Sequence, residues 1–197
     1  MSVLKIGIII LAAGSSKRMG RSKQLLMVNE KELIVHAVET ALQTKSDRVV
    51  VVLGANEKEH CAVLANSAAK IAINKDWEKG MGTSLKVGLN FLIKDFADTN
   101  AALVMVCDQP LVTSTHLNKL ISTQARTGRA IVASAYAGTL GVPALFQNQL
   151  FDEIRSLGDD EGAKKIISKH SNDIAPVAFP GGAIDLDTPE DYRNFAG

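Results

Sequence analysis

The chain has 197 residues, room for one domain, and its 46% hydrophobic and 22% charged residues are ordinary for a globular protein. That composition argues against a disordered chain, a collagen-like repeat and a disulfide scaffold. Lysine and arginine total 22 against 21 acidic residues, and a net charge of +1 lacks the basic excess typical of nucleic-acid binding. We therefore interpret residues 1–197 as a single domain with no nucleic-acid partner.

The longest apolar run, residues 6–13, is far shorter than the roughly 20 residues that a membrane-spanning helix needs. A secretory signal is the weaker interpretation of this run, because it passes directly into a glycine-containing turn. The two cysteines, Cys61 and Cys107, are too few for a disulfide framework and lack the spacing of a metal site. We expect a soluble, cytoplasmic protein without a membrane partner.

Strand-like and helix-like segments alternate along the chain. In chain order we predict a strand over Ile6–Ala12, a helix over Glu30–Gln43, strands over Val49–Leu53 and, more weakly, Ala69–Ile73, a helix over Thr83–Phe96, a strand over Ala101–Cys107, a helix over Thr113–Thr127, strands over Ala130–Ser134 and, more weakly, Val142–Phe146 and Ile174–Phe179, and a last helix from Pro189. Thr113 and Thr188 are suited to cap the helices that follow them.

Continuous apolar strands separated by helices indicate an α/β fold, here a Rossmann-like three-layer sandwich with a mostly parallel central sheet. Ligands of such sheets bind at the carboxyl ends of the strands. The residues that follow each strand are therefore the first candidates for a functional site.

The first strand runs into a turn of small and basic residues. Ala13 and Gly14 let a ligand approach the backbone closely, and successive N–H groups suit an anion. Four cations fall within seven residues of an otherwise neutral chain: Lys17, Arg18, Arg21 and Lys23. The glycine spacing fits neither a P-loop nor the Gly-x-Gly-x-x-Gly pattern of dinucleotide sites. The turn is predicted to hold a triphosphate; the alternative is a solvated basic loop.

From Leu11 to Lys23 this turn has the pattern Leu-Ala-Ala-Gly-x-Ser-x-Arg-Met-Gly-x-x-Lys. It resembles the signature loop of the molybdenum cofactor nucleotidyltransferases and, more narrowly, of the molybdenum cofactor cytidylyltransferases. Companion motifs lie at Gly80–Leu85, Cys107–Pro110, Gly141–Phe146, Asp160–Lys164 and Asp185–Asp191. The resemblance implies a fold like that of nucleotide-diphospho-sugar transferases. It also implies transfer of a nucleoside monophosphate from a nucleoside triphosphate, with Mg²⁺ as cofactor and release of pyrophosphate.

The resemblance also implies residue roles. Arg18, Lys23 and Asp108 would be catalytic, with Arg18 and Lys23 holding the triphosphate. The nucleotide would contact Leu11, Ala12, Ala13, Gly14, Ser15, Arg18, Lys23, Gly80, Met81 and Ser84. The acceptor would contact Gly141, Pro143, Gly162 and Lys164.

Acidic residues follow two of the expected segments. Asp108 ends an apolar strand just before Pro110, and a carboxylate in that position suits a hard cation such as Mg²⁺. Capping of the next turn is the alternative. The resemblance favours Asp187 as second metal ligand, with Asp185 as the alternative, and at strand spacing the two would face one side. Both acids could instead only favour the last helix, as we expect for Glu190 and Asp191.

The implied chemistry needs cations more than a general base, because a phosphate nucleophile is already an anion near neutral pH. None of the four histidines has the spacing of a metal site or a catalytic triad. Ser15, Ser16 and Ser22 have no evident base partner, so a nucleophilic serine is not expected. The turn from Leu11 to Lys23 is instead expected to lie beside Asp108.

Two features bear on the nucleotide. Gly80 and Gly82 precede a helix, where exposed N–H groups suit a base edge or a ribose; a capped turn is the alternative, and Thr83 or Ser84 would serve as cap in either case. Ala13 stands where guanylyl-transferring relatives have glycine. Its methyl group takes room that a purine would use, so CTP is expected in preference to GTP.

The resemblance implies a molybdopterin-type acceptor, whose product would pass to a molybdoenzyme of the xanthine dehydrogenase type. Two residues depart from the family pattern: Val142 replaces a frequent histidine, and Lys164 replaces an arginine and so loses a bidentate grip on phosphate. Another small phosphate or sugar phosphate is therefore an alternative acceptor. A non-catalytic factor that delivers cofactor to a molybdoenzyme is a further alternative, and an NAD-binding module the least supported.

Overall fold

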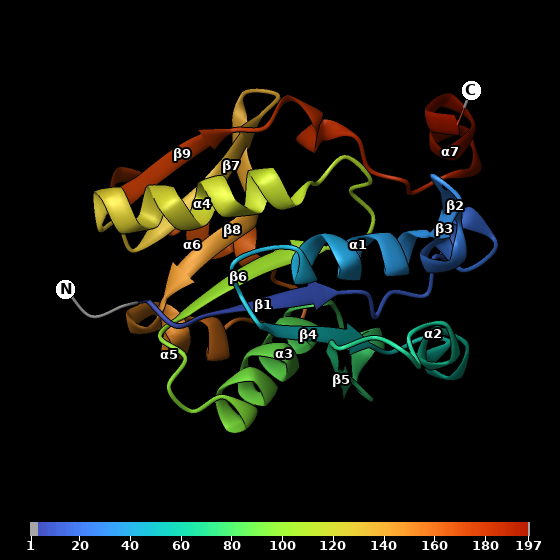
Figure 1. Cartoon of the computed structure of the whole chain (residues 1–197), viewed down its shortest axis with the longest axis horizontal. Helices are drawn as coiled ribbons and strands as arrows, with labels where there is room; N and C mark the ends of the chain where they lie inside the picture. Colours follow the sequence, from blue (N-terminus) through green and yellow to red (C-terminus); the bar gives the residue numbers. More distant parts are fainter. Residues whose placement is uncertain (1–3, 197) are drawn as a thin grey trace.

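The apolar runs of the sequence form one seven-stranded sheet in the computed structural model, which describes residues 4–196 (Figure 1). The strand order is β5-β4-β1-β6-β8-β7-β9, and all adjacent pairs are parallel except the two that involve β8. The strands are β1 Ile6–Leu11, β4 Arg48–Leu53, β5 Lys70–Ile73, β6 Ala101–Val106, β7 Ile131–Tyr136, β8 Thr139–Gln147 and β9 Ile174–Ala178, with a separate hairpin of β2 Met27–Val28 and β3 Lys31–Glu32. The predicted α/β fold with a mostly parallel sheet is confirmed.

Helices cover both faces of the sheet (Figure 1). One face carries α1 Leu33–Leu42 and α4 Ser114–Thr127, and the other carries α3 Met81–Asp95, α5 Phe151–Arg155 and α6 Ala163–Lys169. Successive residues of a strand point to opposite faces, so Ile8 and Ile10 join one core cluster while Ile9 and Leu11 join the other. Two buried cores therefore hold the sheet rigid between its helix layers.

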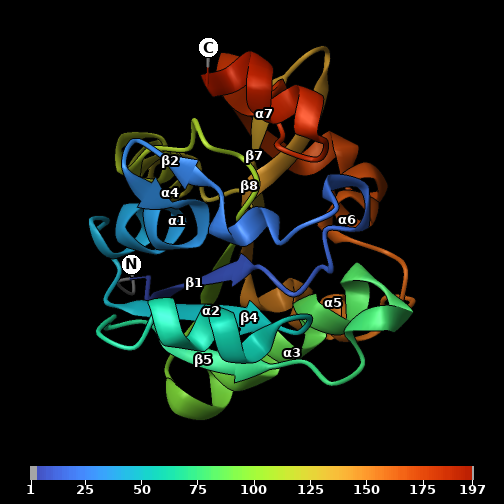
Figure 2. The same cartoon turned by 90° about the vertical axis from the view of Figure 1, so that its right-hand side faces the viewer.

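Two further helices lie at the edge where β1 and β4 end: α2 Glu57–Val63 and α7 Pro189–Ala196. Figure 2 looks onto this edge: α7 lies at the top, near β7 and β8, and α2 lies in the lower half, near β4 and β5. Single 3₁₀ turns occur here as well, at Lys17–Met19, Lys23–Leu25 and Trp77–Lys79, and elsewhere at Asn148–Leu150, Ser171–Asp173 and Pro180–Ala183. No helix within residues 4–196 has both the length and the apolar character needed to cross a bilayer.

Several local expectations change. The helix predicted from Glu30 begins at Leu33, because Lys31 and Glu32 pair with β2 in a hairpin. The helix α5 was not expected, since a segment of five residues shows little periodicity, whereas α2 and α6 lie in the polar stretches around His60 and His170 that we expect to be helical. The two expected caps are confirmed. Thr113 accepts a hydrogen bond from the His116 N–H, and Thr188 accepts one from the Asp191 N–H.

Candidate active site

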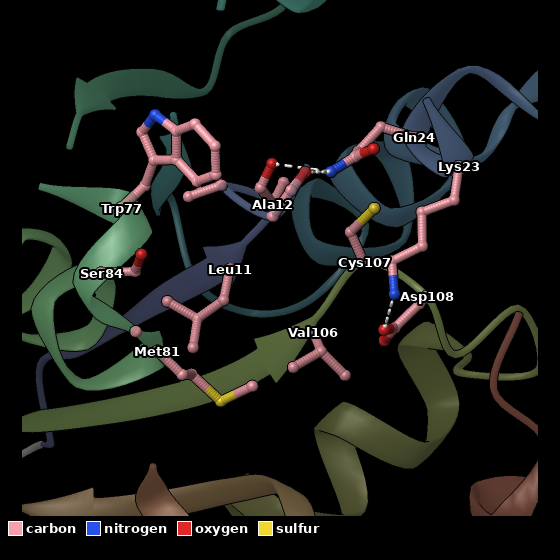
Figure 3. Close-up of a pocket in the computed structure, with 13 residues that line it drawn as sticks. Leu11, Ala12, Lys23, Gln24, Trp77, Met81, Ser84, Val106, Cys107 and Asp108 are labelled. Carbon is pink, nitrogen blue, oxygen red and sulfur yellow. Dashed lines mark hydrogen bonds and ion pairs between the residues drawn. The ribbon is translucent and has the colours of Figure 1, made fainter. Parts of the chain in front are cut away.

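The carboxyl ends of β1 and β6 lie side by side because these strands are parallel neighbours, with Leu11 paired to Val106. The turn after β1 and the Asp108 side chain after β6 therefore face each other. Lys23 Nζ lies 2.5 Å from Asp108 Oδ2, so the expected meeting of this turn with Asp108 is confirmed (Figure 3).

Lys23 is the centre of a cluster of charges. Its Nζ also lies 2.7 Å from Asp187 Oδ1, and Arg18 Nη2 lies 2.8 Å from Asp187 Oδ2. Burial alone would lower the pKa of Lys23, but attraction to Asp108 and Asp187 outweighs it and raises that pKa. Burial likewise opposes ionisation of Asp187, but Lys23 and Arg18 hold the pKa of its carboxyl below the usual value. The cluster therefore keeps Lys23 and Asp187 charged near neutral pH.

The second oxygen of Asp108, Oδ1, is buried and has no hydrogen-bond partner. An unpaired buried carboxylate oxygen is costly unless a cation or donor reaches it. Residues 184–187 form no strand, contrary to the expected strand spacing, yet Asp185 and Asp187 line the same cavity. Burial, together with the charges of Asp108 and Asp187, raises the pKa of Asp185 to about 6. Two carboxylates thus contact the Lys23 ammonium group, and Asp185 lines the cavity beside them.

The turn that carries these cations is held in shape by Gln24. Its side chain is only 1% exposed, and its amide nitrogen donates to the main-chain carbonyls of Ala12 at 3.1 Å and Gly14 at 2.8 Å. Its amide oxygen accepts from the hydroxyls of Ser16 at 2.9 Å and Ser22 at 3.0 Å. The sequence analysis did not identify Gln24, because nothing in the sequence marks a glutamine as the anchor of a turn.

Ser22 has a histidine partner, contrary to expectation. His60 of α2 is completely buried, and its Nε2 lies 2.7 Å from Ser22 Oγ. The hydroxyl proton of Ser22 is donated to Gln24, so the His60 N–H donates to Ser22 rather than accepting from it. His60 therefore anchors the turn to α2 and does not activate Ser22 as a nucleophile.

A cavity of about 240 Å³ opens beside this turn (Figure 3). Its charged end holds Lys23 and Asp108, and its opposite end holds Trp77 and Ser84. A Cβ added to Gly14 would enter open space, which leaves room for a ligand against the backbone. The lining residues are Leu11, Ala12, Ala13, Gly14, Lys23, Gln24, Trp77, Gly80, Met81, Ser84, Val106, Cys107 and Asp108.

The residues that line the smaller cavity include eight of the ten expected nucleotide contacts. Ser15 and Arg18 instead line an adjoining depression on the outer side of the same turn. Trp77 and Val106 were missed: each lies just outside a recognised motif, and neither residue type marks a nucleotide site by itself. Cys107 is buried, and burial raises the pKa of its thiol.

The start of α3 does not offer the exposed N–H groups at Gly80 and Gly82 that were expected to contact a base or a ribose. A Cβ on Gly80 or Gly82 would collide with the backbone of residues 158–161, so packing explains both glycines. The Gly82 N–H donates to the Asp159 carbonyl at 2.8 Å and the Gly80 N–H to the Trp77 carbonyl at 3.2 Å. Neither N–H is therefore open to a base.

The expectation that Thr83 or Ser84 caps α3 is wrong, because the helix already begins at Met81. Their hydroxyl oxygens instead accept hydrogen bonds from the side-chain amide of Asn74, at 2.8 and 2.9 Å. Ser84 still lines the cavity, with its oxygen held by Asn74.

A second cavity of about 380 Å³ adjoins the first and shares Lys23, Met81 and Asp108 with it. Of the expected acceptor contacts, Gly141, Gly162 and Lys164 line it, together with Asp185 and Asp187. Pro143 does not; it is buried, and its carbonyl accepts a hydrogen bond from Ser134. Gln109 and Tyr136 line this cavity as well, although the sequence analysis did not identify them. The Lys23 cluster therefore stands where two cavities meet.

Several known proteins are similar to this chain in sequence or in fold. A family model described as "MobA-like NTP transferase domain" matches residues 8–174. The purine catabolism protein PucB of Bacillus subtilis is 27% identical over 93% of this chain and 92% of its own length. Nicotine blue oxidoreductase of Paenarthrobacter nicotinovorans is 36% identical over 71% of this chain and 65% of its own.

Among solved structures, Rv0371c of Mycobacterium tuberculosis superposes with a TM-score of 0.85 at 26% identity, covering 98% of both chains. A structure of Rv0371c in complex with manganese has a TM-score of 0.80 at 25% identity, covering 96% of this chain and 97% of that one.

Proposed function

This chain belongs to the MobA-like NTP transferase family and is a nucleotidyltransferase, and from that premise we propose that it transfers CMP from CTP to a molybdopterin-type cofactor in the cytoplasm. The observation that carries the proposal is the position of Lys23. Its ammonium group contacts Asp108 and Asp187 where the two cavities meet, so a nucleotide in one and an acceptor in the other would meet at this cluster.

The reaction joins two anions. A phosphate oxygen of the acceptor attacks the α-phosphorus of the nucleotide, a new P–O bond forms, and the bond to the bridging oxygen of the β-phosphate breaks to release pyrophosphate. No proton has to leave the nucleophile, which is already ionised near neutral pH. Lys23 and Arg18 neutralise the triphosphate, and the glycine at position 14 admits it close to the backbone.

The carboxylates of this site fit a divalent cation. Asp108 Oδ1 is buried without a partner, and Asp108 and Asp187 converge on one nitrogen. No three His, Cys, Asp or Glu side chains of residues 4–196 are grouped as a self-sufficient metal site, so phosphate oxygens and water would complete the shell. We propose Mg²⁺ with Asp108 and Asp187 as its protein ligands; when bound, it would neutralise charge on the phosphates.

The nucleotide proposed for the smaller cavity is CTP. Ala13 lines this cavity where its methyl group reduces the space available to a base. The Ser84 oxygen accepts a hydrogen bond from Asn74, which leaves its O–H to donate to a base acceptor. Cytosine presents such acceptors at O2 and N3, so Ser84 suits its edge, while the preference over a purine rests on the space beside Ala13.

The acceptor proposed for the larger cavity is a phosphorylated pterin. Gly141 and Gly162 line its walls, and Lys164 offers one positive charge to a phosphate. A related sugar phosphate, or another small phosphate, is the alternative acceptor. We propose that the product passes to a molybdoenzyme of the xanthine dehydrogenase type.

The test is transfer of labelled nucleotide by the full chain with Mg²⁺, comparing CTP, GTP and ATP against molybdopterin and against sugar phosphates. We expect CTP and molybdopterin to give a labelled dinucleotide and pyrophosphate, and Asp108→Asn to bind CTP without turnover. Pyrophosphate release with a sugar phosphate alone would move the proposal to the alternative acceptor. Equal turnover of CTP and GTP would contradict the base preference.

Two other functions are separated by the same assay. A cofactor-delivery factor would bind nucleotide or cofactor but give no labelled product with any acceptor. One relative is named an oxidoreductase, at 36% identity. If this chain shared that activity, it would oxidise or reduce its substrate and release no pyrophosphate.

A further inference from the structure

Trp77 is a large aromatic side chain at the end of the nucleotide cavity farthest from the charges. It comes from the 3₁₀ turn between β5 and α3, and it is half-buried. In Figure 3 the indole ring stands beside Ala12 and above Ser84, across the cavity from Lys23 and Asp108. A triphosphate at the Lys23 end would direct its base toward this apolar end.

The indole is held in place by its surroundings. A Cβ added to Gly54 would lie 2.7 Å from Trp77 Cβ and 2.8 Å from the Ala13 carbonyl oxygen, so the tryptophan packs directly on the Gly54 backbone. The base of the Trp77 side chain is therefore held against Gly54, and the indole can act as a rigid wall.

The turn that carries Trp77 is also fixed. Asn74 Oδ1 accepts from the Asp76 N–H at 3.0 Å, and Asn74 Nδ2 donates to both Thr83 and Ser84 at the start of α3. Thr83 Oγ1 in turn contacts the carbonyl oxygens of Asp76 and Gly80. The bonds on both sides of Trp77 set its position relative to Ser84.

We propose that Trp77, together with Ala13, limits the base subsite to a pyrimidine, because the fixed indole closes the end of the cavity and leaves no room for the second ring of a purine. This inference rests on the proposed function, because it assumes a nucleotide in this cavity. Aromatic side chains hold bases through their faces with little regard to base identity, so contact with the indole adds affinity, while the size limit comes from its fixed position at the end of the cavity. Ser84 then contacts the edge of the same base.

Trp77 is the one tryptophan of the chain, so its fluorescence reports this contact directly. We would titrate the wild-type protein with CTP, GTP and inorganic tripolyphosphate in magnesium chloride, and measure the binding of each by calorimetry in parallel. We expect CTP to bind and to quench the indole emission, and tripolyphosphate to bind without quenching. Binding of CTP without a change in emission would overturn the role of Trp77 and leave the proposed function intact. Absence of CTP binding would overturn both.

Selectivity is tested with two variants. We expect Trp77→Ala to lower the ratio of kcat/KM for CTP over GTP by at least about tenfold, since a lost wall admits the larger ring. Trp77→Phe keeps an aromatic face and should retain most of the preference. An equal loss of kcat/KM for both nucleotides in Trp77→Ala would show a merely structural role and overturn the proposal.

Discussion

The side-chain amide of Gln24 donates a hydrogen bond of 2.8 Å to the main-chain carbonyl of Gly14, across the turn that faces the nucleotide cavity. A second bond from the same nitrogen reaches the Ala12 carbonyl, and Ser16 and Ser22 donate to the amide oxygen. One buried side chain thus satisfies four polar groups. Because no other side chain of residues 4–196 bonds the Ala12 and Gly14 carbonyls, the shape of the turn depends on the glutamine.

We predict that Gln24→Leu lowers the free energy of unfolding by ~2–4 kcal/mol, because it leaves several buried polar groups unpaired. It should also raise the KM for the nucleotide, since Gly14 loses its fixed position. Chemical denaturation and steady-state kinetics would measure the two effects. Gln149 is exposed, so Gln149→Leu is the matched control and should change neither. Equal stability of the two variants would contradict the role assigned to Gln24.

We predict that Ala13→Gly reduces the preference for CTP over GTP, because removal of the methyl group enlarges the space beside Trp77. The change should be roughly 10-fold or less, as expected for one methyl group in a pocket. The measurement is kcat/KM for both nucleotides. Ala12→Gly is the control: Ala12 lines the same cavity, but Gln24 fixes its carbonyl, and its substitution should lower both values alike. If Ala13→Gly leaves the preference for CTP over GTP unchanged, Ala13 does not limit the size of the base, and Trp77 alone would do so.

The meeting of Lys23 with Asp108 could be predicted from the sequence because it follows from topology. Apolar runs separated by helices predict parallel strands, and the carboxyl ends of neighbouring parallel strands share one edge. The structure pairs β1 with β6 in the register that this requires. Asp187 could be predicted at this site only from the resemblance of its motif to the family, because its segment is not a strand.

Other contacts depend on packing that periodicity does not encode. His60 reaches Ser22 because α2 lies beside the turn; the stretch around His60 is recognisably helical, but its position against the turn is set by packing. Gly80 and Gly82 could be interpreted as ligand contacts until the segment at 158–161 was seen to press on them. Trp77 enters the cavity only because Gly54, from a different strand end, leaves room for it.

The hairpin between β7 and β8 offers a test of backbone strain. Its two turn residues, Ala137 and Gly138, have φ of 47° and 72°, the left-handed conformation that an Asn-Gly pair adopts readily. We predict that Ala137→Asn raises the free energy of unfolding by ~0.5–1 kcal/mol, because alanine is strained there. In the β2–β3 hairpin the equivalent position, with φ of 49°, already carries an asparagine, Asn29. Asn29→Ala should be destabilising by a similar amount, and thermal unfolding that moves both variants in one direction would refute the argument.

The last prediction concerns acid stability and His116, a buried residue of α4. Its Nε2 is 2.8 Å from Ser134 Oγ, and the Ser134 hydroxyl donates to the Pro143 carbonyl, so Nε2 carries the proton and donates. The ring stacks on Phe179 with centroids 4.3 Å apart. Burial, aided by the charge of Lys119, lowers the pKa of His116 to about 4.

Since the unfolded imidazole takes up a proton near pH 6.5 and the folded one only near pH 4, the unfolded state binds more protons between these values. The contribution of His116 to stability is therefore complete above about pH 6.5 and falls on acidification, by on the order of 3 kcal/mol at pH 4. We predict that His116→Gln is less stable than the wild type at pH 7.5 but loses less stability between pH 7 and 4.5. Urea unfolding across this range measures the difference, and parallel curves for the two proteins would show that His116 does not titrate in the way its burial requires.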